Sequence, residues 1–202
     1  MKVKVNARKE TDFYPTLTQF KRLNPDAVFI IAWDEPSGLI AKQAREIGYK
    51  KKLCFTEQIR GKGISVAGLE NVVGSFVGGG SALGSEHMPP GMQKYVAAFE
   101  KKYPGIYPHQ TGLHAHDMLM TACRAMEEGE TAIDAYKIRN AANETIAKIP
   151  IKAYGEYKGI TPGGQAWGYE TVISEIGKDG KTKKISGVTI TEEIAREGEP
   201  KM

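Results

Sequence analysis

The side chains best suited to chemistry in this 202-residue sequence are carboxylates that follow apolar runs. Asp34 and Glu35 come directly after the run Ala27–Trp33, and Glu57 follows a shorter run that ends at Phe55. Carboxylates at such positions can serve as general acid and base, or they can hold the ammonium group of a ligand. The residue types alone leave both possibilities open.

The motifs that would identify an enzyme or a nucleotide-binding protein are missing from the sequence. No serine lies in a G-x-S-x-G elbow, and no H-E-x-x-H pair occurs. The glycine-rich segment 78–84 follows a strand-like run, but it matches neither the dinucleotide fingerprint nor the Walker pattern. We therefore expect a loop there and no cofactor. Without a nucleophile, metal or cofactor, the carboxylates are expected to bind an ammonium group, and the chain is predicted not to be an enzyme.

Two further groups of residues are candidates for metal binding. His114 and His116 are two positions apart on an expected helix, so their side chains point about 200° apart and do not share an ion. Cys54 and Cys123 lie in apolar stretches without a C-x-x-C pair, which favours two buried thiols. The sequence does not place them within disulfide distance of each other. No metal site is predicted.

Trp33 is the remaining candidate for a functional residue. A bulky aromatic side chain at the end of a buried strand either caps the core or faces a ligand, and the sequence leaves both roles open. An aromatic face packs against ligand carbon and attracts a cation. The candidate ligand-binding residues are therefore Trp33, Asp34 and Glu57.

The charge distribution argues against nucleic-acid binding. The net charge is only +4, and the basic residues are scattered apart from short clusters at Lys50–Lys52 and Lys181–Lys184, where loops are expected. The sequence contains no run of 18 apolar residues, so no membrane span is predicted. The segment Met1–Asn6 lacks the apolar core of a signal peptide.

Strands and helices alternate in the first third of the sequence. Lys2–Asn6, Ala27–Trp33 and Lys52–Phe55 are expected strands, and helices are predicted between them over residues 12–23 and 37–47. A β-α-β-α-β order predicts a parallel sheet with right-handed crossovers. Its ligand site would lie outside the carboxyl ends of the strands. Those ends are Ala7–Glu10, Trp33–Glu35 and Thr56–Arg60.

The rest of the sequence changes character. After a glycine-containing crossing segment we expect a strand at Asn71–Val77, and then three helices. The tail reads as extended segments joined by turns, and Asp179-Gly180 is a strong hairpin signal. The expected helices cover residues 92–102, 111–128 and 131–148, and the expected extended segments cover 154–160 and 169–176.

Several of these segments resemble one protein family. They are Asp12–Lys21, Asn24–Phe29, Ala41–Gly48, Phe99–Pro104, Ala115–Asp117 and Gly155–Gln165. In order and spacing they are similar to the leucine/isoleucine/valine-binding family of ABC-transporter substrate-binding proteins, which are type I periplasmic binding proteins. The resemblance covers most of residues 2–180 and corresponds to the C-terminal portion of the family.

The resemblance implies a fold, a division into lobes and a binding site. Members have two Rossmann-like lobes, each built on a doubly wound parallel sheet. The two lobes close on an amino acid, and the chain crosses between them three times. Residues 1–68 would belong to the second lobe, 69–150 to the first, and 151–202 to the second lobe and a tail. Glu57 stands where the family has the glutamate that holds the α-ammonium group, and Trp33 stands at the aromatic position.

The resemblance also implies missing parts and partners. The family's signal peptide, most of its first lobe, and the opening strand and helix of its second lobe have no counterpart here. The missing part of the first lobe carries the groups that bind the ligand carboxylate, so we expect weak or no amino-acid binding by this chain alone. The intact protein would be periplasmic and would deliver ligand to an ABC permease. Unpaired strand edges predict a homodimer.

Two alternatives to ligand capture for import remain. The same fold can serve a sensory or regulatory module that reports amino acids or amides to a signalling partner. An α/β enzyme that uses Asp34, Glu35 or Glu57 is the second alternative.

Overall fold

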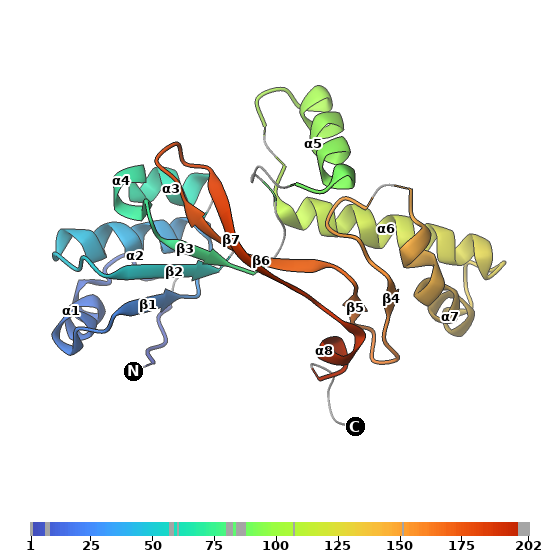
Figure 1. Ribbon diagram of the computed structural model, residues 1–202, viewed down its shortest axis with the longest axis horizontal. Coiled ribbons are helices and arrows are strands. Elements are labelled where there is room, and N and C mark those ends of the chain that lie inside the picture. The colour runs from blue at the N-terminus through green and yellow to red at the C-terminus, as the bar shows by residue number, and fades with distance from the viewer. Residues whose placement is uncertain are drawn as a thin grey trace. The chain divides into compact units, whose positions relative to one another are not determined.

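The chain forms two compact units, each with its own core (Figure 1). The computed structural model describes residues 2–6, 9–56, 59, 61–79, 83, 88–106, 108–150 and 152–197. Unit 1 contains the described residues up to Gly79 together with Val172–Ser186. Unit 2 contains Leu83, the described residues from Met88 to Thr171, and Gly187–Glu197.

Unit 1 is built on a five-stranded sheet (Figure 1). Three parallel strands from the first part of the sequence lie next to two strands from its last part. The parallel strands β1, β2 and β3 pair in sequence order, and β3 pairs antiparallel with β6. The predicted parallel α/β sheet is therefore confirmed. The strand order is β1 (Ala27–Ile30), β2 (Lys52–Thr56), β3 (Phe76–Gly78), β6 (Glu170–Ile176) and β7 (Thr182–Thr189).

Four helices accompany this sheet: α1 (Tyr14–Leu23), α2 (Asp34–Glu46), α3 (Lys62–Ala67) and α4 (Leu69–Val72). Leu53 and Phe55 on one face of β2 and Cys54 on the other are all buried, as expected for a strand covered on both faces. Helix α2 begins three residues earlier than Ser37, where the sequence placed its start, because Trp33 already holds the extended conformation that precedes a first turn.

Two predicted strands are wrong. Lys2–Asn6 alternates like a strand, but the structure assigns no strand there, because these residues pair with no neighbouring ladder. Asn71–Val77 was expected to be one strand, whereas only Phe76–Gly78 is extended. Its first residues, Asn71 and Val72, instead belong to α4, where the side-chain Nδ2 of Asn71 donates a hydrogen bond to the carbonyl of Ala67 at 2.8 Å.

The two units divide the chain at residues other than the expected lobe boundaries. Residues 69–79 lie in unit 1, because β3 pairs directly with β2. Residues 152–171 lie in unit 2 together with the helices that precede them. The assignment of residues 1–68, 69–150 and 151–202 to the lobes of the family stays a prediction.

Unit 2 is mainly helical. The helices α5 and α6 begin within two residues of the predicted starts, and α7 begins four residues later than predicted, after Asp134 caps its amino end. The core of the unit includes the fully buried Met92 and Leu113. The elements are α5 (Pro90–Lys102), α6 (Gln110–Glu128), α7 (Ala135–Thr145), the 3-10 turn η1 (Ile146–Lys148), β4 (Gly159–Ile160), β5 (Ala166–Trp167) and α8 (Glu192–Glu197).

The predicted hairpin at Asp179-Gly180 is confirmed. It connects β6 to β7, and Gly177 and Lys181 close it with a backbone hydrogen bond of 2.8 Å. Gly180 has a φ of 77°, a conformation that glycine adopts without a steric penalty. None of the helices in the described part of the chain has the length and apolar character of a transmembrane span.

Candidate functional site

The candidate site lies at the carboxyl edge of the parallel strands in unit 1. Ile30 of β1 is in register with Phe55 of β2, and Phe55 is in register with Val77 of β3. The three strands therefore end side by side. This edge is where open α/β sheets bind ligands, because loops from neighbouring strands converge there.

Trp33 lies three residues beyond the end of β1 and directly before α2. Its φ and ψ of −69° and 169° are extended, and 61% of the residue is exposed. Of the two roles that the sequence left open, the structure excludes a core cap. An indole exposed at a strand end remains free to pack against a ligand, so ligand contact by Trp33 stays a prediction.

Asp34 connects the end of β1 to the start of α3. Its Oδ1 accepts a hydrogen bond of 2.8 Å from the backbone N–H of Gly63. A side chain at position 63 would collide with Asp34, so the contact requires glycine. A side chain at Gly38, one turn further along α2, would collide with the carbonyl group of Gly63. The Asp34 carboxylate therefore has a structural role, and its predicted contact with a ligand is untested.

Glu35 is engaged at the surface by Lys62, the first residue of α3. Both side chains are more than half exposed. The hydrogen bond with Glu35 is the main reason that the pKa of Lys62 lies above its ordinary value. This pair adds a second link between the starts of α2 and α3, and it gives Glu35 a partner other than a substrate.

Glu57, the third predicted site residue, lies outside the described residues. The described chain of β2 ends at Thr56, which is half-buried and in register with Gly78. The adjacency of β1 and β2 that the sequence predicted is confirmed. The joint placement of the Glu57 carboxylate and the Trp33 indole stays a prediction.

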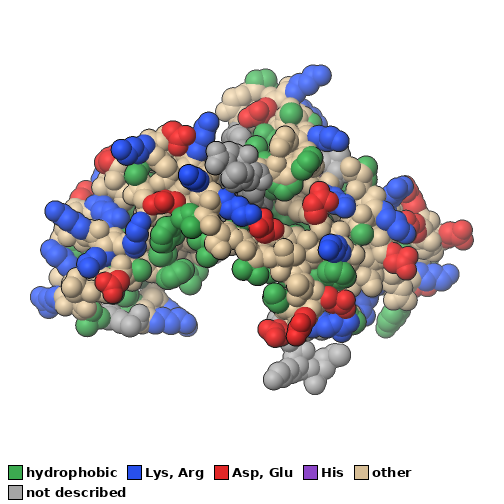
Figure 2. Space-filling model, viewed as in Figure 1, with side chains coloured by type: hydrophobic (Ala, Val, Ile, Leu, Met, Phe, Trp, Pro, Cys, Tyr) green, Lys and Arg blue, Asp and Glu red, His purple; other side chains and the backbone are tan. Residues whose placement is uncertain are grey.

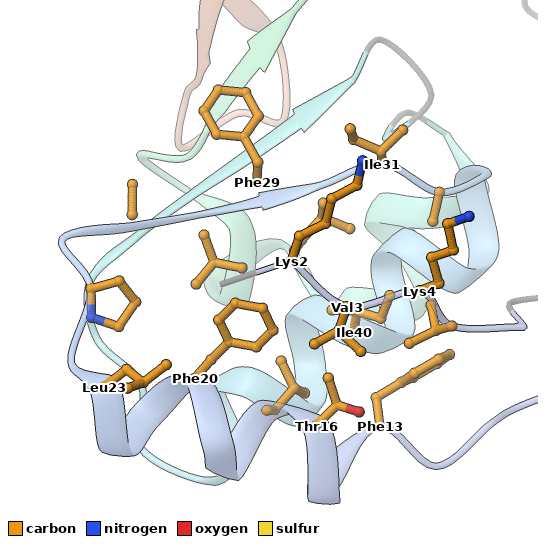
Figure 3. A pocket seen from close by; sticks show the side chains of 17 residues that line it. Lys2, Val3, Lys4, Phe13, Thr16, Phe20, Leu23, Phe29, Ile31 and Ile40 are labelled. Carbon is orange, nitrogen blue, oxygen red and sulfur yellow. The ribbon is translucent and has the colours of Figure 1, made fainter.

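A separate, apolar groove of about 760 Å³ lies next to β1, between this strand, α1 and residues 2–5 (Figure 3). Residues 2–5, α1 and β1 line it, and neither Trp33 nor Asp34 is among the lining residues. In Figure 3, Thr16, Phe20 and Leu23 lie on the α1 side, whereas Phe29 points away from α1. The groove could not be predicted from the sequence, because it depends on where residues 2–5 lie relative to β1.

The histidine-rich segment of α6 has a structural role in unit 2. Asp117 is buried, and its two oxygens accept hydrogen bonds of 2.8 Å from the backbone N–H groups of Ala153 and Tyr154. His116 contributes a third contact to the Asp117 carboxylate at 2.9 Å, and the ring of His114 packs on Tyr154. In the described part of the chain, no group of three potential metal ligands comes together.

The role of Asp117 was not predicted from the sequence. An acidic residue at helical spacing from Leu113 and Ala125, on the buried face of α6, was the available signal. Tyr154, Tyr157 and Tyr169 form an aromatic cluster next to it, and burial is the main cause that raises the pKa of Tyr157 far above its ordinary value. These tyrosines belong to the core of unit 2, so we assign them to packing.

Comparison with known proteins connects this fold to a family. A family model described as periplasmic binding protein matches residues 2–180. A leucine-binding protein from Thermotoga maritima superposes with a TM-score of 0.74 at 21% identity, over 90% of this chain and 49% of that one. A branched-chain amino-acid substrate-binding protein from Streptococcus pneumoniae, solved with isoleucine, gives 0.67 at 16% identity, with the same coverage of both chains.

A third solved structure shows the same relation. A periplasmic ligand-binding protein of a branched-chain amino-acid ABC transporter from Burkholderia xenovorans gives a TM-score of 0.70 at 17% identity, over 92% of this chain and 50% of that one. The chain thus spans about half the length of the solved structures it matches. No curated protein sequence matches the chain.

Proposed function

Because this chain belongs to the periplasmic binding protein family, a family of solute-binding proteins, we propose that it is the ligand-binding portion of a substrate-binding component that captures branched-chain or related amino acids for an ABC importer. The observation that carries the proposal is the exposed Trp33 at the shared carboxyl edge of β1 and β2. The chain would contribute one wall of the binding cleft and would perform no reaction.

Two properties of this wall suit an amino-acid ligand. The exposed indole of Trp33 offers an apolar face for an aliphatic side chain, and it attracts a cation through its ring quadrupole. Glu57 follows β2 by one residue, so its carboxylate would accept charge-assisted hydrogen bonds from the ligand's ammonium group. We propose that the Asp34 carboxylate supports this wall through Gly63, with ligand contact as its second role.

The proposed mechanism is closure of two lobes around the ligand, after which the permease recognises the closed form. The relatives named above include one solved with isoleucine and one described as periplasmic, which supports an amino-acid ligand and an extracytoplasmic location. The permease is the proposed partner. A homodimer through unpaired strand edges stays a prediction, and light scattering at rising protein concentration would measure it.

Calorimetric titration with leucine, isoleucine and valine tests the proposal. We expect weak heats that vanish in a Glu57→Gln variant, whose fold is checked by circular dichroism. A Glu175→Gln variant serves as the control, because Glu175 lies on β6 and not at the carboxyl edge of β1 and β2. Turnover of a substrate that Glu57→Gln abolishes would instead favour an enzyme. Equal heats in both variants would remove Glu57 from the site.

A further inference from the structure

The two lysine clusters of the sequence lie at one edge of the sheet in unit 1. Lys52 opens β2, whereas the hairpin that follows β6 carries Lys178 and Lys181. Because β6 runs antiparallel to β3, it ends beside the starts of β2 and β3. The Nζ of Lys52 lies 3.5 Å from a carboxylate oxygen of Glu175, although 123 residues separate the two in the sequence. The fold therefore joins into one surface what the sequence shows as two separate clusters.

This surface, which we call the basic edge, lies at the amino ends of the parallel strands, opposite the carboxyl edge with the candidate site. It is formed by the exposed side chains of Lys50, Lys51, Lys52, Lys178, Lys181 and Lys183. Figure 2 shows Lys and Arg side chains gathered on the left part of unit 1, where β2 begins in Figure 1. The strands β2 and β6 are two strand spacings apart, about 10 Å, which is about one Debye length in 0.1 M salt. The charges of the two clusters therefore act together.

Part of this charge is balanced within the basic edge. Lys51 lies 3.4 Å from Asp26, and Lys52 pairs with Glu175. All four side chains are at least 42% exposed, and exposed pairs of this kind bind their partners weakly. Acidic residues at the nearby helix ends and in the hairpin, Glu46, Glu70 and Asp179, are outnumbered by Lys21, Arg22, Lys50, Lys178, Lys181, Lys183 and Lys184. The basic edge therefore keeps an excess of positive charge.

We propose that the basic edge binds a membrane surface that contains anionic phospholipids. A lysine held near such a surface raises the membrane partition coefficient by about fivefold, and several lysines on one edge multiply this effect. The four-carbon stem of lysine is flexible, so each ammonium group can reach a headgroup phosphate from a fixed strand end. The contact is electrostatic, and it is therefore weak, reversible and sensitive to salt.

The composition of the basic edge fits a lipid surface better than a protein or a nucleic acid. Protein–protein interfaces are enriched in arginine and aromatic residues and depleted of lysine. Nucleic-acid bases are read mainly by bidentate side chains such as arginine and by aromatic stacking. The side chains that form the basic edge are lysines, and the guanidinium group of the nearby Arg45 is engaged with the backbone carbonyls of Tyr49, Lys51 and Asn71. Lysines that act as point charges match a surface of many phosphates without a fixed pattern.

The basic edge and the candidate site lie at opposite ends of the same strands. Strand β2 has five residues, so its two ends are about 16 Å apart. A membrane bound at the amino ends would leave Trp33 and the carboxyl ends of β1 and β2 uncovered. Lipid binding would thus hold the chain at a membrane while the candidate site stays accessible. This inference does not rest on the proposed amino-acid site, and its experiment is separate.

Co-sedimentation with lipid vesicles tests the proposal. The full chain is mixed with vesicles of phosphatidylcholine alone, or of equal parts of phosphatidylcholine and the anionic phosphatidylglycerol. We expect the partition coefficient to be at least about tenfold higher for the anionic vesicles at low salt. It should fall as the salt concentration rises from about 0.01 M to about 0.1 M, because the Debye length shrinks from about 30 Å to about 10 Å.

Two variants of equal net charge locate the effect. The first neutralises three lysines of the basic edge: Lys50→Gln, Lys178→Gln and Lys181→Gln. The control neutralises three exposed lysines of α5 in unit 2: Lys94→Gln, Lys101→Gln and Lys102→Gln. We expect the first variant to lower the partition coefficient for anionic vesicles at least about tenfold, and the control to lower it less than about threefold.

Circular dichroism melts that match those of the parent chain check that both variants are folded. Equal partition into the two kinds of vesicle, or an equal loss in the two variants, would overturn the proposal. Duplex DNA that binds more tightly than anionic vesicles at the same salt, and that the first variant no longer binds, would assign the basic edge to nucleic acid instead.

Discussion

The Oδ1 of Asp34 accepts a hydrogen bond of 2.8 Å from the backbone N–H of Gly63, and this contact joins the first turn of α2 to the first turn of α3. Both helices begin at the carboxyl edge of the sheet where the candidate site lies. A residue that sequence analysis assigned to the ligand therefore also determines how the two loops of that edge are held.

Asp34→Ala is expected to destabilise unit 1 by about 1–3 kcal/mol, because it leaves the half-buried N–H of Gly63 without its acceptor. Urea unfolding followed by circular dichroism measures the loss. Glu35→Ala is the matched control, since it removes an exposed ion pair and should cost about 0–1 kcal/mol. Equal unfolding midpoints for the two variants would show that the Asp34 contact contributes no more to the free energy of unfolding than the exposed ion pair does.

Gly38→Ala is expected to destabilise unit 1 by about 1–3 kcal/mol, because the new methyl group would collide with the carbonyl of Gly63 and force α2 away from α3. Gly112→Ala in α6 is the control. There the new methyl group would meet only the hydroxyl of the Tyr95 side chain, at 3.2 Å, and alanine favours the helix. Thermal melts of both variants check the difference, and a Gly38→Ala melt at the parent temperature would contradict it.

Asp117→Asn should destabilise unit 2 by roughly 2–4 kcal/mol. The amide group of asparagine would direct donors at the N–H group of Ala153 or Tyr154, which needs an acceptor. Denaturant unfolding followed by Trp167 fluorescence in a Trp33→Phe background, which removes the tryptophan of unit 1, measures the change. Asp134→Asn is the control, because asparagine caps a helix about as well as aspartate does. A loss of the same size in both variants would argue against the Asp117 interpretation.

The two cysteines should react at very different rates in the folded protein. Cys54 is 7% exposed, but the expectation that both thiols are buried is wrong for Cys123, which is exposed. Burial raises the pKa of the Cys54 thiol above its ordinary value. Since the thiolate is the reactive form, a thiol reagent at neutral pH should label Cys123 quickly and Cys54 only on unfolding. Cys123→Ser should remove the fast phase. Two fast phases would show that β2 is accessible in solution.

The pH dependence of stability follows from the same shift. A thiol whose pKa is raised in the folded state ionises more readily in the unfolded state, so its contribution to stability is lost as the pH rises above the pKa of the unfolded thiol. Cys54→Ala should flatten the stability profile on the alkaline side of that value. An unchanged profile in this variant would assign the alkaline loss to other groups.

Elements that depend on local patterns were predictable from the sequence. The apolar run of β2 and the bounds of the helices α5 and α6 match the structure closely, because burial and a 3.6-residue period are visible in the sequence. The strand expected over Ala27–Trp33 extends only over Ala27–Ile30, and its expected burial on both faces is wrong, since Phe29 is 73% exposed. The strand predicted at Lys2–Asn6 is wrong because strand formation depends on more than the local pattern. Its alternation fits a strand, but a strand forms only beside a partner, and no ladder reaches it.

The site was predictable only in outline. The carboxyl ends of β1 and β2 meet as expected, because parallel strands connected by helices leave few alternatives. The Asp34–Gly63 contact and the Asp117 contacts join residues 29 to 37 positions apart, and single-sequence patterns do not encode such pairs. The position of Glu57 relative to Trp33 stays a prediction.

The pairing of β3 with β6 imposes an order on biosynthesis. Phe76 is in register with Glu175, and Lys52 contacts Glu175 at 3.5 Å although 123 residues separate them. Until residues 170–176 have left the ribosome, β3 therefore has no partner on the side away from β2. Closure of so long a loop is slow, so the nascent chain passes through an aggregation-prone intermediate in which one edge of β3 is unpaired. We expect the yield of folded protein to depend on chaperones.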